Sequence, residues 1–140
     1  MTSDYEAFTK MLIDDMRAHG DEVTIGPMAG RPLMLLTTKG AKTGKDRVAI
    51  VTYTRDGGRY VIAGSKSGAP SNPAWYHNLI ANPEVTVEAG GETFRARATV
   101  TSGEERDRLW EQHAEQRPEF REYPKITNRV IPMMVLERID

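Results

Sequence analysis

The protein has 140 residues, of which 19 are basic and 20 acidic, so its formal net charge is −1. A chain of this length fits one domain with a single hydrophobic core. The balanced charge argues against nucleic-acid binding and against general attraction to acidic membranes, so any anion site must be local. Because there is no cysteine, disulfides, thiolate metal sites and cysteine nucleophiles are excluded, and the expected location is the cytoplasm.

The first 30 residues are expected to form an amphipathic helix and a linker ahead of a domain that spans residues 31–140. Ser3 and Glu6 have the spacing of a capping box, and Gly20 is expected to end the helix. Apolar residues recur at helical spacing, namely Tyr5, Phe8, Met11, Leu12 and Met16. Such a stripe usually packs on its own domain, but it also suits a partner or the inner face of a membrane as a peripheral contact. No segment has the roughly 20 apolar residues of a transmembrane span.

Six segments rich in apolar and β-branched residues are predicted to be strands. They are Leu33–Thr38, Val48–Thr54, Arg59–Gly64, Glu84–Glu88, Glu92–Val100 and Ile131–Arg138. Short turns between successive segments favour antiparallel pairing of neighbours. We therefore predict a mainly β fold of the α+β class, a closed or nearly closed barrel of about six mostly antiparallel strands with helices at its rims. Closure of a barrel removes unpaired strand edges.

A polar stretch with two glycines, residues 39–47, joins the first two predicted strands. The glycines allow backbone conformations in which amide groups converge on an anion, and Lys42, Lys45 and Arg47 add positive charge. A solvated hairpin loop explains the same residues equally well. The stretch is not a P-loop, because only three residues separate the glycines and a strand pattern follows.

A second element suited to anions follows the third predicted strand. The loop at residues 64–71 contains Lys66, and Asn72 and Pro73 are expected as the cap and first residue of a helix. That helix is expected to end at Asn82-Pro83. Amides at a helix N-terminus carry partial positive charge, so this end of the helix can also attract an anion.

Two adjacent aromatic residues, Trp75 and Tyr76, lie in this predicted helix. At least one is expected in the core, and the other can then face the two loops, because neighbours on a helix point in different directions. Basic residues, a helix N-terminus and an aromatic side chain together suit a phosphorylated, flat, conjugated cofactor. The residues alone do not name that cofactor.

The C-terminal third is predicted to contain one more helix. Ser102 and Glu105 form a second capping box, and the helix is expected to end before Pro118. The aromatic-bearing residues 119–129 are predicted to be irregular. No histidine has the spacing of a metal ligand pair, and the serines of the second loop have no nucleophile-elbow pattern, so we expect neither a metal site nor covalent hydrolysis.

Several of these segments together carry a family resemblance over residues 31–138. They are Leu35–Arg47, Arg55–Gly58, Gly64–Ala69, Asn72–Leu79, Ala81–Pro83 and Arg129–Pro132. In order and spacing they resemble the deazaflavin-dependent nitroreductase family, the class A flavin/deazaflavin oxidoreductases that use coenzyme F420. The resemblance implies a split β-barrel similar to the FMN-binding split barrels. It also implies an F420-dependent oxidoreductase, in which the reduced deazaflavin gives a hydride to an electron-poor acceptor.

The resemblance further implies a set of site residues. Lys42, Thr43 and Arg47 match positions that hold the phosphate and acidic tail of F420, and Lys66 is expected to reach the same tail. The remaining matches, beside the tail, along the ring and at the helix start, are Ala41, Val48, Ala49, Ile50, Val51, Thr52, Ala63, Gly64, Ser65, Ala74, Trp75, Tyr76, His77 and Asn78.

Two positions depart from the family pattern. Ala41 stands where many members have Arg or Lys, so the tail is expected to be held less firmly, with Lys45 as a substitute. Phe120 and Tyr123 fall where members often place tyrosines over the substrate pocket. Because Phe120 has no hydroxyl, the candidate proton donors and catalytic residues are Tyr123 and Ser65, with solvent as the alternative.

The expected acceptors are small molecules with an activated double bond, such as enones, quinones and unsaturated lactones, with nitroaromatics as side substrates. Two alternatives stay open, namely an FMN-dependent split-barrel oxidoreductase and a non-catalytic protein that binds F420 or a tetrapyrrole. The expected assembly is a monomer or a homodimer.

Overall fold

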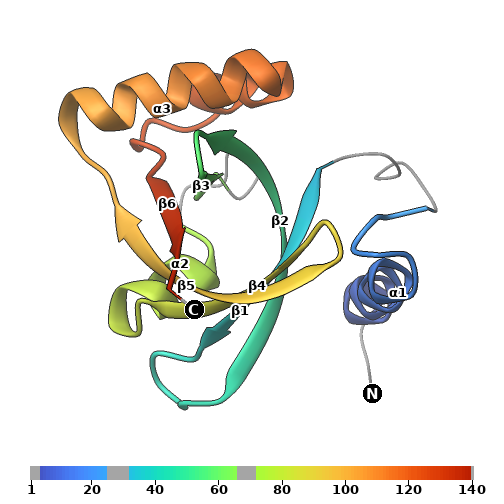
Figure 1. Ribbon diagram of the computed structural model, residues 1–140. Coiled ribbons are helices and arrows are strands. Elements are labelled where there is room, and N and C mark those ends of the chain that lie inside the picture. The colour runs from blue at the N-terminus through green and yellow to red at the C-terminus, as the bar shows by residue number, and fades with distance from the viewer. Residues whose placement is uncertain (1–3, 25–31, 66–71, 140) are drawn as a thin grey trace.

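The computed structural model describes residues 4–24, 32–65 and 72–139 and has a closed barrel of six strands at its centre (Figure 1). The strands are β1 (Leu33–Lys39), β2 (Asp46–Asp56), β3 (Arg59–Ala63), β4 (Glu84–Ala89), β5 (Glu92–Val100) and β6 (Met133–Arg138). Their order around the barrel is β1-β2-β3-β6-β5-β4, and every neighbouring pair is antiparallel. The predicted barrel is therefore confirmed.

Alternation along the strands gives the barrel an apolar interior and a second set of apolar contacts outside. In β1, Met34 and Leu36 belong to the interior cluster, whereas Leu33 and Leu35 belong to a different cluster beneath the first helix. The same alternation in β5 places Phe94, Ala96 and Ala98 in the interior. Because side chains alternate along a strand, a strand such as β1 contributes apolar residues both to the barrel interior and to its outer face.

The first helix, α1 (Asp4–Ala18), packs on the outer face of the barrel. Its residues Leu12 and Met16 are buried there, and Arg17 donates two hydrogen bonds to the carboxylate of Glu88 on β4, at 3.0 and 3.1 Å. Phe8 and Met11, on the same predicted stripe, remain exposed. Part of the stripe therefore packs on its own domain. Among the described helices, none is long and apolar enough to cross a membrane.

The capping box expected at Ser3 and Glu6 involves side chains outside the described part of the chain. The helix ends at Ala18, two residues before the predicted stop at Gly20.

In the described ranges, three further helical segments lie around the barrel. They are α2 (Ala74–Ala81), α3 (Gly103–Gln116) and the 3-10 helix η2 (Pro118–Lys125). Figure 1 shows α3 lying across one end of the barrel, where it packs against β2, β3 and β6. Apolar residues of α3 and η2 form a separate buried cluster with the outer faces of β3 and β6.

Two local predictions in this region were wrong. Ser102 is the N-cap residue of α3, but its side chain makes no capping hydrogen bond. The next residue, Gly103, has a φ of 61°, outside the right-handed region that a capping box requires at that position. Residues 118–125, expected to be largely irregular, form η2 because Phe120 is buried in the cluster beside α3.

Candidate active site

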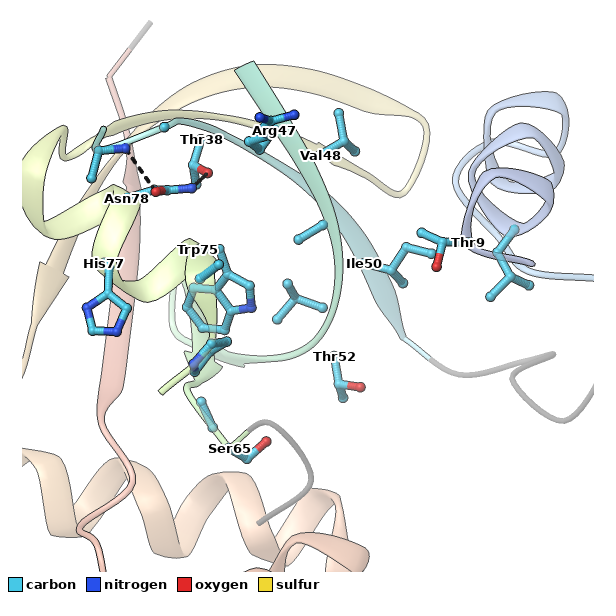
Figure 2. Close-up of a pocket in the computed structure, with 18 of the residues that line it drawn as sticks. Thr9, Thr38, Arg47, Val48, Ile50, Thr52, Ser65, Trp75, His77 and Asn78 are labelled. Carbon is cyan, nitrogen blue, oxygen red and sulfur yellow. Dashed lines mark hydrogen bonds between the residues drawn. The ribbon is translucent and has the colours of Figure 1, made fainter. Parts of the chain in front are cut away.

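A pocket of about 1320 Å³ lies along β2, between α1, α2 and η2 (Figure 2). Its residues come from five separate parts of the chain, so the barrel brings together segments that are distant in sequence. The β1–β2 loop lies at one end of the pocket, the middle of β2 forms a wall, and Phe120 and Tyr123 contribute from η2.

The wall of the pocket contains a backbone edge of β2 that pairs with no strand among the described residues. Residues 46–52 of β2 pair with β1, whereas the pairing with β3 covers residues 53–56. The N–H of Tyr53 donates to the carbonyl of Pro32, on the β1 side. Because the direction of the peptide groups alternates along a strand, the N–H and C=O groups of Val48 and Ile50 point away from β1. These groups are available to a ligand in the pocket.

The β1–β2 loop is closed by its own hydrogen bonds. The N–H of Gly40 donates to the carbonyl of Lys45 at 2.8 Å, and the N–H of Gly44 donates to the carbonyl of Gly40 at 2.9 Å. Gly44 has a φ of 70°, and a Cβ atom on Gly40 would lie 2.7 Å from Thr43 Oγ1. The turn therefore favours glycine at both positions.

Most of the loop amides are thus already bonded within the protein. The N–H of Ala41 donates to Asn78 Oδ1 at 3.0 Å, and the N–H of Lys45 donates to Thr43 Oγ1 at 3.2 Å. The prediction that the loop amides converge on an anion was therefore wrong for these groups. Positive charge at this end of the pocket comes mainly from side chains.

Three cationic side chains of this loop have no acidic partner in the described part of the chain. Lys42, Lys45 and Arg47 are exposed, and no carboxylate of residues 7–24, 32–65 or 72–139 pairs with them. By contrast, Arg59 and Arg108 share the carboxylate of Asp56. Their charge holds the pKa of Asp56 well below its usual value, mainly through the hydrogen bonds from Arg108 and Arg59. Unpaired cations concentrated at one place suit an anionic ligand.

The start of α2 differs from the prediction by one residue. The N-cap is Pro73, with no side-chain hydrogen bond, whereas Asn72 was expected to cap the helix. The side chain of Asn72 instead accepts a hydrogen bond from Arg129 Nη1 at 2.7 Å. Arg129 Nη2 also donates to the carbonyl of Ser65 at 2.8 Å, and burial lowers the pKa of this guanidinium. Asn72 thus forms a charge-assisted hydrogen bond with Arg129 in place of the expected N-cap hydrogen bond to α2.

Of the two adjacent aromatic residues, Trp75 lines the pocket and Tyr76 does not. Figure 2 shows the ring of Trp75 projecting from α2 towards β2. Tyr76 packs against the interior cluster of the barrel and contacts His77 edge to face at 5.4 Å. Trp75 also packs on that cluster, so its ring is both a core residue and a pocket wall.

The two candidate proton donors lie at the end of the pocket near η2. Ser65 is buried, and Tyr123 is half-buried and packs on Phe120 with ring centroids 5.1 Å apart. In the described residues, neither Ser65 Oγ nor the Tyr123 hydroxyl has a hydrogen-bond partner. Both hydroxyls can therefore bond to a ligand.

The pocket collects most of the residues predicted for the site. Those that line it are Ala41, Lys42, Thr43, Arg47, Val48, Ala49, Ile50, Val51, Thr52, Ala63, Ser65, Ala74, Trp75, His77, Asn78, Phe120 and Tyr123. Gly64 is not in the lining, and its N–H donates to the carbonyl of Pro132. Tyr76 is also outside the lining, and Lys66 lies outside the described residues.

Several lining residues were not predicted from the sequence. Phe8, Thr9 and Leu12 of α1 line the pocket, as does Glu119 of η2. The apolar stripe of α1 was the available signal for Phe8 and Leu12, but nothing in the sequence placed that stripe beside β2. Within the described residues, no group of three or more His, Asp or Glu side chains could hold a metal ion.

A closed antiparallel barrel with a pocket along an unpaired strand edge, cationic at one end and apolar along its walls, defines a split-barrel protein of the cofactor-binding class. The model of the F420H(2)-dependent quinone reductase family matches residues 11–138. The chain belongs to this family. It is an F420-dependent oxidoreductase, and reduced coenzyme F420 is its hydride donor.

Three relatives illustrate the similarity. An F420H(2)-dependent quinone reductase of Mycobacterium tuberculosis is 42% identical over 110 residues, which cover 76% of this chain and 74% of the relative. A solved F420-H2 dependent reductase, FDR-A, is 39% identical with a TM-score of 0.70 and covers 76% of this chain and 95% of its own. A solved domain-swapped dimer is 32% identical with a TM-score of 0.73 and covers 94% of this chain and 98% of its own.

The pocket residues fit this cofactor. The unpaired cations Lys42 and Arg47 suit its phosphate and acidic tail, and the peptide groups of Val48 and Ile50 suit polar ring atoms. Trp75 adds an aromatic surface for a flat ring. The pocket thus offers charge at one end and apolar surface along its walls.

Proposed function

We propose that the protein reduces quinones and related electron-poor conjugated acceptors, using the hydride of reduced coenzyme F420. The observation that carries the proposal is the concentration of unpaired cations at one end of a pocket whose wall is apolar. That asymmetry orients a ligand that has an anionic end and a flat ring. It leaves the end near η2 for the acceptor.

Binding of the cofactor is assigned to the loop, to β2 and to α2. Lys42, Thr43 and Arg47 hold the phosphate and acidic tail, with Lys66 as a further cation from the family resemblance. The backbone of β2 between Val48 and Thr52 holds the ring, and the Trp75 side chain limits its movement. This arrangement restricts the reacting ring to one wall of the pocket, which is the main contribution of a protein to hydride transfer.

The acceptor is assigned to the space between Ser65, Phe120 and Tyr123. Reduction of a quinone to a hydroquinone adds a hydride and a proton, and negative charge develops on the acceptor oxygen. The hydroxyls of Ser65 and Tyr123, which have no protein partner in the described residues, can stabilise that charge. Tyr123 is the proposed proton donor, and the apolar ring of Phe120 helps to exclude water.

The same site suits other acceptors in which an electron-withdrawing group activates a double bond. We propose enones and unsaturated lactones as further substrates, because hydride addition again places charge on a carbonyl oxygen. Nitroaromatics are proposed as side substrates.

The test measures oxidation of reduced F420 by the purified protein, with a panel of quinones, enones, lactones and nitroaromatics. Turnover is expected to be fastest with quinones, and FMN is expected to bind much more weakly than F420 in fluorescence titrations. Tight F420 binding without turnover of any acceptor would support a carrier and overturn the proposal. Tighter binding of FMN than of F420 would overturn the cofactor assignment.

A further inference from the structure

His113 of α3 is fully buried, although an apolar residue could occupy this position without loss of solvation. Its Nδ1 atom is hydrogen-bonded to Thr54 Oγ1 of β2 at 2.8 Å. In the described residues its Nε2 atom has no hydrogen-bond partner. A buried polar side chain that satisfies only one of its two nitrogen atoms carries a cost, so the position of its one hydrogen bond is informative.

The ring of His113 also packs on Phe120, one of the two aromatic residues of η2 that line the pocket. The rings of His113 and Phe120 are nearly perpendicular, at 87°, with centroids 4.5 Å apart. Phe120 in turn packs on Tyr123 at 5.1 Å and 67°. Edge-to-face contacts of this kind have a preferred direction as well as an apolar area. The orientation of the His113 ring therefore affects where Phe120 and Tyr123 lie.

Thr54 connects the three side chains in edge-to-face contact, His113, Phe120 and Tyr123, to the wall of the pocket. It lies on β2 two residues after Thr52, so both side chains point to the same face of the strand. Thr52, Phe120 and Tyr123 all line the pocket, whereas Thr54 and His113 do not. A continuous series of contacts thus runs from β2 through His113 to η2, behind the pocket lining.

We propose that His113 is a positioning residue for the acceptor, which fixes η2 relative to β2 through its hydrogen bond to Thr54 and its ring contact with Phe120. The proposal rests on the proposed function, because it assigns the η2 end of the pocket to the acceptor. In the part of the chain that the structure describes, the hydrogen bond and the ring contact of His113 go to β2 and η2, and neither goes to the β1–β2 loop or to α2. Its effect is therefore confined to the acceptor end and leaves the cofactor end unchanged.

The hydrogen bond is the directional part of this arrangement. A phenylalanine at position 113 keeps an aromatic ring beside Phe120 but cannot bond to Thr54. Valine at position 54 keeps the shape of threonine and removes the same bond from the other side. The two substitutions His113→Phe and Thr54→Val are expected to have similar effects, and the double variant is expected to resemble either single variant.

The first experiment compares cofactor and acceptor binding in these variants. The Kd of F420 is measured by fluorescence titration, and kcat and KM are measured with menadione, a soluble naphthoquinone. Both variants are expected to raise the KM for menadione about fivefold, the effect of roughly one hydrogen bond, and to leave the Kd of F420 within about twofold. Unchanged KM values, or a parallel loss of F420 affinity, would overturn the proposal.

Leu109→Ala provides the matched control for loss of packing. Leu109 is buried in the same helix and belongs to the cluster that contains Phe120, but it is not part of the series of contacts from Thr54 through His113 to Phe120. This variant is expected to lower the melting temperature with little change in the KM for menadione. If Leu109→Ala raises KM as much as His113→Phe at a similar melting temperature, His113 has only a structural role and the proposal fails.

A second readout requires neither cofactor nor turnover. Hydrogen exchange of the backbone amides in η2 is compared with that of the β1–β2 loop in the protein without F420. Faster exchange in η2 alone is expected for His113→Phe and for Thr54→Val. Equal exchange in wild type and both variants would contradict the proposal. A wild-type protein that turns over no acceptor, while η2 exchange still responds to His113→Phe, would refute the proposed function and retain the positioning of η2.

Discussion

The side-chain amide of Asn78 on α2 accepts a hydrogen bond from the N–H of Ala41 in the β1–β2 loop at 3.0 Å (Figure 2). Its Nδ2 atom donates to Thr38 Oγ1, a buried hydroxyl at the end of β1, at 3.1 Å. Both ends of one amide are thus used to hold the basic loop against α2. The distance between Lys42 and Trp75, and therefore the fit of a ligand to both, depends on this contact.

We predict that Asn78→Ala weakens F420 binding about tenfold, the effect expected when a bridge of two hydrogen bonds is lost. Asn82→Ala is the control, because Asn82 follows the last residue of the same helix and bonds to the carbonyl of Lys39 at 3.4 Å. Fluorescence titration of both variants checks the prediction. Equal Kd values for Asn78→Ala and wild type would show that the loop keeps its position without the bridge.

Lys42 and Arg47 are predicted to supply most of the charge that holds the cofactor tail. Replacing either by alanine is expected to weaken F420 binding about tenfold or more, because hydrogen bonds to charged groups contribute about 1.5–3 kcal/mol. The dependence of Kd on salt is expected to become shallower in both variants, since fewer ion pairs remain to be screened.

Arg97→Ala is the control for these two variants. Arg97 is an exposed cation on β5 that pairs with Glu84 and does not line the pocket. Titrations at two salt concentrations should show no change in its Kd or in its salt dependence. A similar loss of affinity in all three variants would indicate only a nonspecific effect of net charge.

The barrel could be predicted from the sequence because its signals are local. Strand alternation and short turns identified six strands in nearly the observed places, although β2 begins at Asp46 rather than Val48. The pairing of β1 with β4, and of β3 with β6, joins strands separated by long segments. The sequence did not predict these two pairings, because the argument that a barrel leaves no unpaired edge requires closure without saying which distant strands meet.

The errors arose where a distant contact replaced a local one. Asn72 is a residue type that often caps helices. Its side-chain oxygen instead accepts a hydrogen bond from Arg129, 57 residues further on. Residues after Pro118 have no helical periodicity, yet burial of Phe120 against His113 orders them as η2. A single sequence does not indicate that these residues will be partners, because neither contact follows from a regular spacing along the chain.

The candidate site was predicted mainly through family resemblance rather than through residue chemistry. Composition indicated an anion site at the β1–β2 loop, formed by loop amides together with basic side chains, whereas the amides of Gly40 and Ala41 bond within the protein. The contribution of α1 to the pocket could not be predicted, because the packing of Leu12 beside β2 depends on the fold.

Tyr123 is predicted to donate the proton to the reduced acceptor. Tyr123→Phe removes only the hydroxyl, and kcat with menadione is expected to fall about 10²-fold, the lower range for loss of a general acid. The Kd of F420 is expected to stay unchanged. Tyr76→Phe is the matched control, because Tyr76 is on α2 but does not line the pocket. A pH profile of kcat that is the same in wild type and Tyr123→Phe would assign proton donation to solvent or to Ser65.

The buried state of His113 predicts how stability depends on pH. Burial, reinforced by the charge of Arg117 and opposed by that of Glu119, lowers the pKa of His113 from 6.5 to about 4. The unfolded chain therefore binds a proton at a higher pH than the folded protein does. The free energy of unfolding therefore falls as the pH is lowered from about 6.5 towards 4, because only the unfolded state gains a proton on His113 in this range. Above about pH 6.5 the histidine is neutral in both states and this loss is absent.

Urea unfolding of wild type and His113→Phe at pH 7 and pH 5 tests this prediction. Phenylalanine does not titrate, so wild type is expected to lose about 2 kcal/mol more than the variant between the two pH values. Because both proteins share all other titrating groups, the difference between them isolates His113. Equal losses in the two proteins would mean that the imidazole is protonated in the folded state at pH 5, which is incompatible with a buried, neutral ring bonded to Thr54.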